Sequence, residues 1–374
     1  MDNQKVEFVD TKYGKEKILK SVIIPTRNEE DYIEECINSL LDGYIPSDTE
    51  FIVVDGMSTD RTIEIVKEKF SHLNLKILEN PNLYQAYAMN IGIENSASTS
   101  DVIIRADAHS KYLEGHIERC YRDYNSDWIG KLENDVGNLG SVQCAVGINF
   151  FTRIVADVMN SGYAMGGVQY RKIDNNPLQP IEEAYIQSDT AYLGCWKKSV
   201  LIELGGFNEE FQINEDYELN IRIRRSERKV MVSKSSIVDY YVRSSIFGLI
   251  KQFFRYGLWK TKTLSVHPDS FKLRQLAPVL FVLFLITLGI GNLILPNPYL
   301  LILNASSSII GVFWLIMILL IWKNSPNNRT FRDPKFDLIF SIFFIPFIVL
   351  SMHISWGLGF LYGLIRWAKG GWKS

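Results

Sequence analysis

The hydrophobic pattern between residue 20 and about residue 110 alternates between short apolar runs and segments with apolar residues at helical spacing. The short runs predict strands at 21–24, 51–54, 75–78 and 101–105. The segments between them predict helices, with apolar faces formed by Ile33, Ile37, Leu40 and Leu41, by Ile63, Val66 and Phe70, and by residues 86–93. Such alternation is typical of right-handed βαβ crossovers, so the sequence predicts an α/β fold with a mainly parallel central sheet.

The chain is less regular from residue 111 to residue 240, with a glycine-rich stretch at 162–167 and a proline-containing loop at 174–180. We expect this region to shape the pocket of a second substrate. Residues 241–270 then combine apolar and aromatic positions at helical spacing with Lys251, Arg255, Lys260 and Lys262. This pattern predicts an amphipathic helix that lies in the headgroup region of a membrane.

Apolar residues dominate the chain from Leu276 onward, in stretches at 276–296, 299–322 and 337–365. The first two are near the length that spans a bilayer, and the turn at 296–298 joins them into a hairpin. The third stretch fits either a single crossing or a broken, re-entrant pair, since Pro346, Gly357 and Gly359 interrupt it. The sequence therefore predicts a membrane region of three or four helices.

The loop between the second and third stretches carries Lys323, Arg329, Arg332 and Lys335, which places it in the cytoplasm by the positive-inside rule. The N-terminal residues lack the apolar core of a secretory signal. We therefore expect a multi-pass protein of the cell membrane whose soluble part faces the cytoplasm.

Composition excludes some classes of function. The net charge is −2, and no basic stripe interleaved with aromatic residues occurs in the first 270 residues, so we expect no nucleic-acid partner. The four cysteines are far apart and form no C-x-x-C pair, which disfavours a structural zinc site and a disulfide framework.

Candidate chemistry lies where the predicted strands end. The segment DVIIRADAH delivers Asp107 and His109 together at the carboxyl end of a strand, where open α/β sheets place their ligands. A carboxylate oxygen and an imidazole nitrogen two residues apart can reach one divalent cation. The alternative is a strand that merely ends in polar residues.

Two earlier strands end in VIIPTRNEE and IVVDGMSTD. Asp55 lies at the tip of the second, where a carboxylate can accept hydrogen bonds from a nucleobase or ribose. Asn28, Ser58 and Asp60 are also typical helix caps, and that interpretation stays open for them.

The segment INEDYELNIRIRR places Glu215, Asp216 and Glu218 in the first turn of a predicted helix. A carboxylate there can act as a general base toward a sugar hydroxyl, although the helix dipole alone also favours acidic residues at this position.

Together these motifs resemble the family 2 inverting glycosyltransferases of the GT-A fold. The resemblance covers roughly residues 20–260 and rests on ordered motifs: PTRNEE, VVDGMSTD, A-x-N-x-G at 88–92, D-x-H at Asp107, GGFNEEF at 205–211, the pair Glu215-Asp216, and Q-x-x-R-Y at Gln252. The D-A-H form of the metal motif, QFFRYG and the C-terminal apolar helices are similar to the succinoglycan-type exopolysaccharide glucosyltransferases. His109 stands where many family members have a second carboxylate, which leaves the metal preference open.

The resemblance implies the fold, the organisation and the roles of individual residues. It implies a GT-A nucleotide-sugar-binding domain at 20–240, after an N-terminal extension at 1–19 and before the interfacial helix at 241–270 and the membrane region at 271–374. Asp107 and His109 would hold Mg²⁺ or Mn²⁺, Asp216 would be the catalytic base, and Pro25, Glu29 and Asp55 would cradle the nucleoside, most often uridine. Substrate-binding residues would be Pro25, Thr26, Glu29, Asp55, Arg105, Glu215, Gln252, Arg255 and Tyr256.

The expected function is transfer of a hexose from a nucleotide sugar to a lipid-linked or oligosaccharide acceptor in the synthesis of a surface or exported polysaccharide. Other polysaccharide assembly proteins are candidate partners. Two alternatives stay open: a processive polymer synthase, for which Q-x-x-R-Y is the relevant signature, and a catalytically silent scaffold subunit. Retention of Asp55, Asp107 and Asp216 together disfavours the silent subunit.

Overall fold

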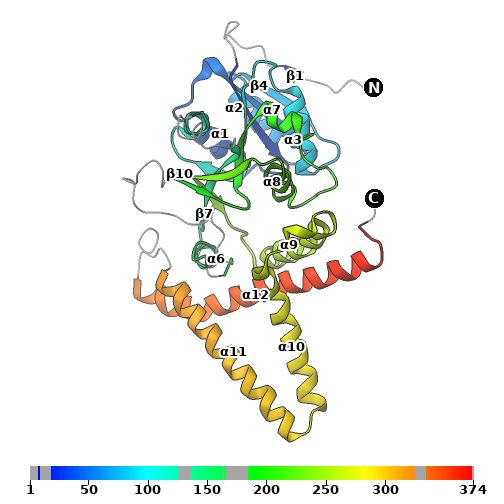
Figure 1. Ribbon diagram of the computed structural model, residues 1–374. Helices are drawn as coiled ribbons and strands as arrows, with labels where there is room; N and C mark the ends of the chain where they lie inside the picture. Colours follow the sequence, from blue (N-terminus) through cyan, green and yellow to red (C-terminus); the bar gives the residue numbers. More distant parts are fainter. Residues whose placement is uncertain are drawn as a thin grey trace. The chain divides into compact units, whose positions relative to one another are not determined.

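The computed structural model describes residues 7–8, 18–125, 136–162, 164–165, 184–324 and 334–372 (Figure 1). The chain divides into two compact units. The first, here called the sheet unit, comprises residues 1–144 and 172–241, and the second, the helical unit, comprises 145–171 and 242–374. The helical unit thus includes a segment from the middle of the chain, which the sequence pattern did not indicate.

Ten strands of the described residues form one sheet in the order β1-β4-β3-β2-β5-β9-β7-β10-β6, with β8 beside β10. The run β4-β3-β2-β5 is parallel, as the sequence predicts. The strands of this run are β2 (Lys20–Thr26), β3 (Thr49–Asp55), β4 (Leu75–Glu79) and β5 (Val102–Arg105). Their carboxyl ends therefore meet at one edge of the sheet, where Thr26 pairs with Asp55.

Helices cover both faces of the parallel strands. These are α1 (Ile33–Leu41), α2 (Thr62–Phe70), α3 (Gln85–Asn95) and α4 (His116–Tyr124), with the short helix η1 (Pro46–Asp48) before β3. The alternation along β2 gives the reason: Val22 and Ile24 pack with α1, α2 and α4 in one core, whereas Ile23 faces α3. Gly92 of α3 lies so close to Ile23 that a Cβ there would force the Ile23 side chain to shift.

The other half of the sheet is antiparallel. Strand β9 (Tyr192–Lys197) pairs with β5 on one side and β7 (Val136–Val146) on the other, and β10 (Lys229–Tyr241) pairs with β6 (Ser110–Tyr112) and β8 (Tyr185–Gln187). Strand β1 (Glu7–Phe8) adds an antiparallel edge beside β4. The helices here are α7 (Lys198–Glu203) and α8 (Glu215–Arg225). The sheet as a whole is mixed, and the loop expected at 174–180 lies outside the described residues.

The helical unit contains α6 (Phe150–Asn160), α9 (Ile246–Val266), α10 (Leu276–Ile294), α11 (Asn297–Asn324) and α12 (Pro334–Ala368), with short helices η4 (Pro268–Ser270) and η5 (Leu273–Gln275). Figure 1 shows α10 and α11 as two long helices joined by the tight turn that the sequence predicts. The third apolar stretch is one continuous helix, α12. Among the described residues, Leu273–Ile294 and Phe344–Ala368 are helices long and apolar enough to cross a membrane. Of the predicted cytoplasmic loop, residues 325–333 are outside the described part.

Helices α9 and α12 pack at very short range through glycine. A Cβ at Gly359 would collide with the carbonyl oxygen of Phe254, and one at Gly257 with that of Trp356. Small residues at such positions let two helix backbones touch, as in membrane helix pairs. Two of the basic residues that we expected on an interfacial surface are buried: Lys260 Nζ donates to the Ser270 carbonyl at 3.3 Å, and Lys262 Nζ to that of Trp372 at 3.3 Å.

Candidate functional site

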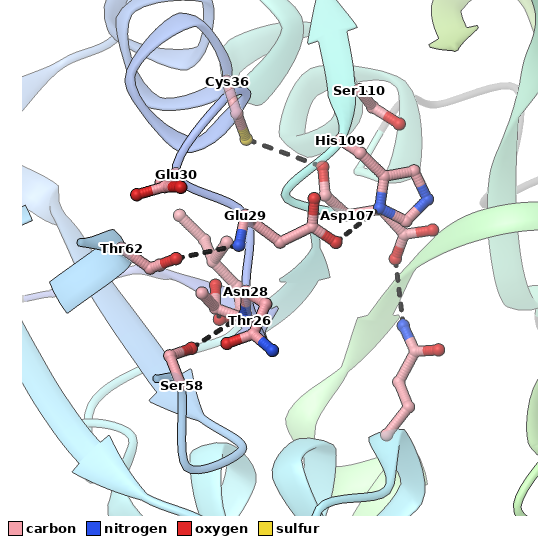
Figure 2. Close-up of polar contacts among 12 residues, drawn as sticks. Thr26, Asn28, Glu29, Glu30, Cys36, Ser58, Thr62, Asp107, His109 and Ser110 are labelled. Atoms are coloured by element: carbon pink, nitrogen blue, oxygen red, sulfur yellow. Dashed lines mark hydrogen bonds and ion pairs between the residues drawn. The ribbon is translucent and has the colours of Figure 1, made fainter. Parts of the chain in front are cut away.

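A pocket opens at the carboxyl edge of the parallel strands, the place where the sequence predicts a ligand. Five of the predicted site residues line it: Pro25, Thr26, Glu29, Asp107 and His109. They come from the end of β2, the loop before α1, and the turn between β5 and β6 (Figure 2). The fold thus gathers into one pocket residues that are about 80 positions apart in the sequence.

Asp55 lies at the tip of β3, between two lining residues of this pocket, Val54 and Gly56. Its Oδ1 accepts the hydroxyl of Ser58 at 2.5 Å, and its Oδ2 accepts the Ser58 backbone N–H at 3.1 Å. These local bonds fix the carboxylate at the end of the strand, with the side chain nearly buried.

The polar residues considered as helix caps instead join two loops. The backbone N–H of Asn28 donates to Ser58 Oγ at 2.9 Å, and the side-chain oxygen of Asn28 accepts the backbone N–H of Thr59 at 2.8 Å. Asn28 has a φ of 54°, a left-handed conformation that asparagine tolerates better than most residues. Of the three, Asp60 does support a helix start, because its Oδ1 accepts the Thr62 N–H at 3.0 Å. The loops before α1 and α2 are therefore held as one rim of the pocket.

Asp107 is buried and held from two sides. Its Oδ1 accepts Nε of Arg105 at 3.0 Å and Nε2 of Gln85 at 3.0 Å. Burial alone would raise the pKa of Asp107, but the charge of Arg105 and the hydrogen bonds from Arg105 and Gln85 outweigh it, so its pKa is lowered. The carboxyl group is consequently ionised at neutral pH, the state in which it can bind a cation.

His109 is the second candidate ligand and is oriented by Glu29. Its Nδ1 lies 3.0 Å from Oε1 of Glu29, and Figure 2 shows the two side chains pointing toward one another. On the other side, the ring of Tyr240 contacts the imidazole edge to face, with 5.8 Å between centroids. The ring is therefore fixed in the pocket wall.

Arg105 links the metal motif to the candidate base. Its Nη1 donates to Oε1 of Glu215 at 3.3 Å, and Asp216 follows directly in the first turn of α8. Burial and the neighbouring Asp216 raise the pKa of Glu215 to about 7 although Arg105 opposes this, and burial likewise raises the pKa of Asp216. Paired carboxyl groups with raised pKa values beside a buried arginine are typical of acid–base sites.

The start of α8 is positioned by contacts from two other motifs. Asn90 accepts the backbone N–H of Phe207 at 2.8 Å and donates to its carbonyl at 2.9 Å, which joins α3 to the loop before α8. The guanidinium group of Arg222 donates hydrogen bonds to the Glu218 carboxylate, and its Nη2 also donates to the Gly206 carbonyl at 2.8 Å. Through these contacts the A-x-N-x-G and GGFNEEF motifs connect α3 to the loop that leads into α8, the helix that carries Asp216.

Gln252, Arg255 and Tyr256 belong to the helical unit, where all three lie on α9. Nε2 of Gln252 donates to the Tyr256 hydroxyl at 2.9 Å, and both side chains are half-buried there.

The described residues contain no group of three or more His, Cys, Asp or Glu side chains placed to share a metal ion. Asp107 and His109 still offer one oxygen and one nitrogen on the same pocket wall. Two protein ligands suit a cation whose remaining positions are filled by the phosphates of a substrate.

Sequence reasoning missed Gln85, which bonds to Asp107, and the pairing of Glu29 with His109. A usable signal existed for Gln85: it directly precedes a predicted helix that follows a parallel strand, so its side chain starts at the same edge of the sheet. The contact of Glu29 with His109 joins residues 80 positions apart, and no local pattern reports it.

Comparisons with known proteins agree with the predicted resemblance. Residues 21–129 match the family model described as glycosyl transferase family 2. The chain is 27% identical over 353 residues to the "dolichyl N-acetyl-alpha-D-glucosaminyl phosphate 3-beta-D-2,3-diacetamido-2,3-dideoxy-beta-D-glucuronosyltransferase" of Methanococcus voltae, which covers 92% of this chain and 97% of that protein. It is 27% identical over 268 residues to the succinoglycan biosynthesis protein ExoA of Rhizobium meliloti, covering 69% of this chain and 74% of that protein.

One similar solved structure is that of the mannosyltransferase PcManGT of Pyrobaculum calidifontis in complex with GDP-Man and Mn²⁺. The TM-score is 0.53 and the sequence identity is 15%, and the match covers 97% of this chain and 90% of that chain. At this identity the likeness concerns the fold. The predicted GT-A fold is confirmed.

Proposed function

We propose that this chain, whose residues 21–129 form a glycosyltransferase family 2 domain, moves a hexose from a UDP-linked donor to a lipid-linked glycan at a membrane surface. As a family 2 glycosyltransferase it acts on nucleotide sugars in glycan biosynthesis. The hexose, the uridine carrier, the lipid-linked acceptor and inversion at the anomeric carbon are our proposal.

The pocket at the carboxyl edge of the parallel strands is the main support for this proposal. Pro25 and Thr26 line it, and Asp55 lies at its rim, which suits hydrogen bonding to a nucleoside. Asp107 and His109 line the same pocket, where they could hold the diphosphate that follows the nucleoside. When bound there, Mg²⁺ or Mn²⁺ would offset the negative charge of the departing nucleoside diphosphate.

Asp216 is the residue to which we assign the role of base. Its carboxylate removes the proton of the acceptor hydroxyl as that oxygen attacks the anomeric carbon, while the bond to the nucleoside diphosphate breaks. A single displacement of this kind inverts the anomeric centre and needs no covalent nucleophile. Arg105 keeps Glu215 and Asp107 at fixed separation, so the base and the diphosphate site keep their relative position.

The acceptor is inferred from the second unit. Two helices of the described residues meet the length and composition of membrane spans. The Methanococcus voltae relative, whose name includes a dolichyl phosphate-linked sugar, is matched over 92% of this chain and 97% of its own length. Both observations support a multi-pass protein that acts on a membrane-borne acceptor, with the sheet unit on the cytoplasmic side as the basic loop predicts.

The test measures release of nucleoside diphosphate by membranes that contain this chain, with a panel of nucleotide sugars, with Mn²⁺, Mg²⁺ or EDTA, and with a lipid extract as acceptor. We expect metal-dependent turnover of one UDP-sugar and a product one sugar longer than the acceptor. A ladder of products identifies a processive synthase instead. A chain that binds no nucleotide sugar at all contradicts the proposal and favours a silent scaffold subunit.

A further inference from the structure

Each candidate metal ligand has one atom engaged by a neighbouring side chain. Nδ1 of His109 lies 3.0 Å from Glu29 Oε1, and Oδ1 of Asp107 accepts Arg105 and Gln85, each at 3.0 Å. The structure gives Oδ2 of Asp107 and Nε2 of His109 no hydrogen-bond partner among the described residues. Both side chains are therefore held by one atom while the other remains available (Figure 2).

The contact with Glu29 also decides the chemical form of His109. A carboxylate only accepts hydrogen bonds, so in the neutral imidazole Nδ1 must carry the hydrogen. The lone pair is then on Nε2, the atom that is free to bind a cation. Metal-binding histidines usually donate their second N–H to a carboxylate or carbonyl in this way, and the contact fixes both tautomer and ring orientation.

Glu29 is well placed for such a role because its own backbone is fixed. Its N–H donates to Thr62 Oγ1 at 2.8 Å, and the next residue, Glu30, donates its N–H to Asp60 at 3.2 Å. The Glu29 side chain is only 19% exposed. The carboxylate is thus presented to His109 from a loop that is tied to a second loop.

We infer that Glu29 is a positioning residue that acts through His109, presenting Nε2 of the imidazole to the divalent metal of the bound donor. This rests on the proposed function and gives Glu29 a different role from the one that the sequence resemblance implies, which is contact with the nucleoside. The two roles make opposite predictions about metal-free nucleotide binding. A nucleoside contact works without metal, whereas a positioning residue matters only when the metal is bound.

The experiment measures two affinities of the full-length chain in detergent. One is the affinity for Mn²⁺ in the presence of saturating UDP, followed by the electron paramagnetic resonance signal of free Mn²⁺, and the other is the affinity for UDP in EDTA, by calorimetry. The variants are Glu29→Leu, which removes the acceptor, and Glu29→Gln, whose amide oxygen can still accept from Nδ1. Glu34→Leu is the matched control, because Glu34 is a half-exposed glutamate on α1 that pairs with Lys69.

We expect Glu29→Leu to weaken Mn²⁺ binding by about 10- to 100-fold, the usual effect of removing such a partner, with UDP affinity in EDTA unchanged. Glu29→Gln should recover part of the loss, and Glu34→Leu should match the original protein in both assays. Since Glu29 acts through His109, the pair Glu29→Leu/His109→Ala should bind Mn²⁺ no worse than His109→Ala alone.

Two results overturn the inference while leaving the proposed function intact: unchanged Mn²⁺ affinity in Glu29→Leu, or an equal loss of UDP affinity in EDTA, which would make Glu29 a nucleoside contact. Additive losses in the double variant overturn it as well. If the original protein binds neither UDP nor Mn²⁺ with UDP, the proposed function itself fails. Thermal unfolding of each variant separates loss of binding from loss of folding.

Discussion

The two units differ in where their large apolar side chains lie, although each of them buries lysine. In the sheet unit, buried charges are paired: Lys20 is fully buried between Asp48 at 2.7 Å and Glu118 at 2.6 Å, and apolar residues fill the interior. In the helical unit, large apolar side chains face outward, with Leu293 85% exposed, while Lys262 is 6% exposed. This difference supports the proposal that the helical unit associates with a membrane while the sheet unit is surrounded by water.

The largest expected effect comes from the polar interior of the sheet unit. Asp216→Asn keeps the shape of the side chain but removes the proton acceptor, so we expect kcat to fall by about 10²- to 10⁴-fold. Binding of Mn²⁺ with UDP should be unchanged. The measurement is turnover of the donor identified in the panel, with Glu203→Gln, an exposed partner of Arg228, as control. Normal turnover by Asp216→Asn would show that the base is another residue.

Replacing a leucine by alanine in each unit tests whether large apolar side chains are buried in one unit and exposed in the other. Leu40 is fully buried in α1, so Leu40→Ala should destabilise the sheet unit by about 2–5 kcal/mol. Leu293→Ala on α10 removes a side chain that touches little protein, and we expect a change within about 0.5 kcal/mol. Thermal unfolding of both variants in one detergent measures the difference. Equal losses would mean that α10 packs against protein and does not face lipid.

The raised pKa of Glu215 leads us to expect that the stability of the metal-free protein depends on pH. This pKa rises from the ordinary value of 4.5 to about 7 on folding. As pH rises from 4.5 to 7, the unfolded chain releases this proton before the folded chain does. The free energy of unfolding therefore falls over this window, by up to about 3 kcal/mol.

Denaturant unfolding of the metal-free protein at a series of pH values checks this expectation, with Glu215→Gln as the comparison. The variant has no proton to lose, so the difference between the two pH profiles should be concentrated between pH 4.5 and 7. Parallel profiles would mean that Glu215 titrates as it does in water.

The smallest loss of stability that we expect comes from substituting a glycine at a close helix contact in the helical unit. Gly359→Ala forces a methyl group against the Phe254 carbonyl, and we expect a loss of about 1–3 kcal/mol. Gly289 is a matched control, since a Cβ added there meets nothing within 4 Å. Gly289→Ala should be neutral or stabilising because alanine favours helix. Comparable melting temperatures for the two variants would rule out close packing of α9 on α12.

The parallel half of the sheet could be predicted from sequence because each of its strands is bounded locally. Val22, Ile24, Phe51 and Val53 sit in short apolar runs that end in turn residues, and the next helix begins within a few positions. The candidate site followed from the same pattern, since Asp55 is the last residue of one such strand and Asp107 lies two residues beyond the end of another. Parallel strands then bring these ends to one edge.

What the sequence did not reveal depends on partners far apart in the chain. The place of β9 between β5 and β7 depends on the pairing of Ile104 with Cys195, which no local pattern encodes. Lys260 and Lys262 look like surface residues of an amphipathic helix, yet packing within the helical unit buries them. Glu29 matches a family motif, but only the fold shows that its carboxylate meets His109.

The position of β9 has a consequence for synthesis of the chain on the ribosome. Strand β5 ends at Arg105, but β9, which covers its outer edge, is complete only at Lys197. At about 5–20 residues per second, that edge stays unpaired for about 5–20 s of translation. An uncovered strand edge is a template for association with other chains. A nascent chain stalled or cut before β9 emerges would therefore expose its parallel sheet to aggregation.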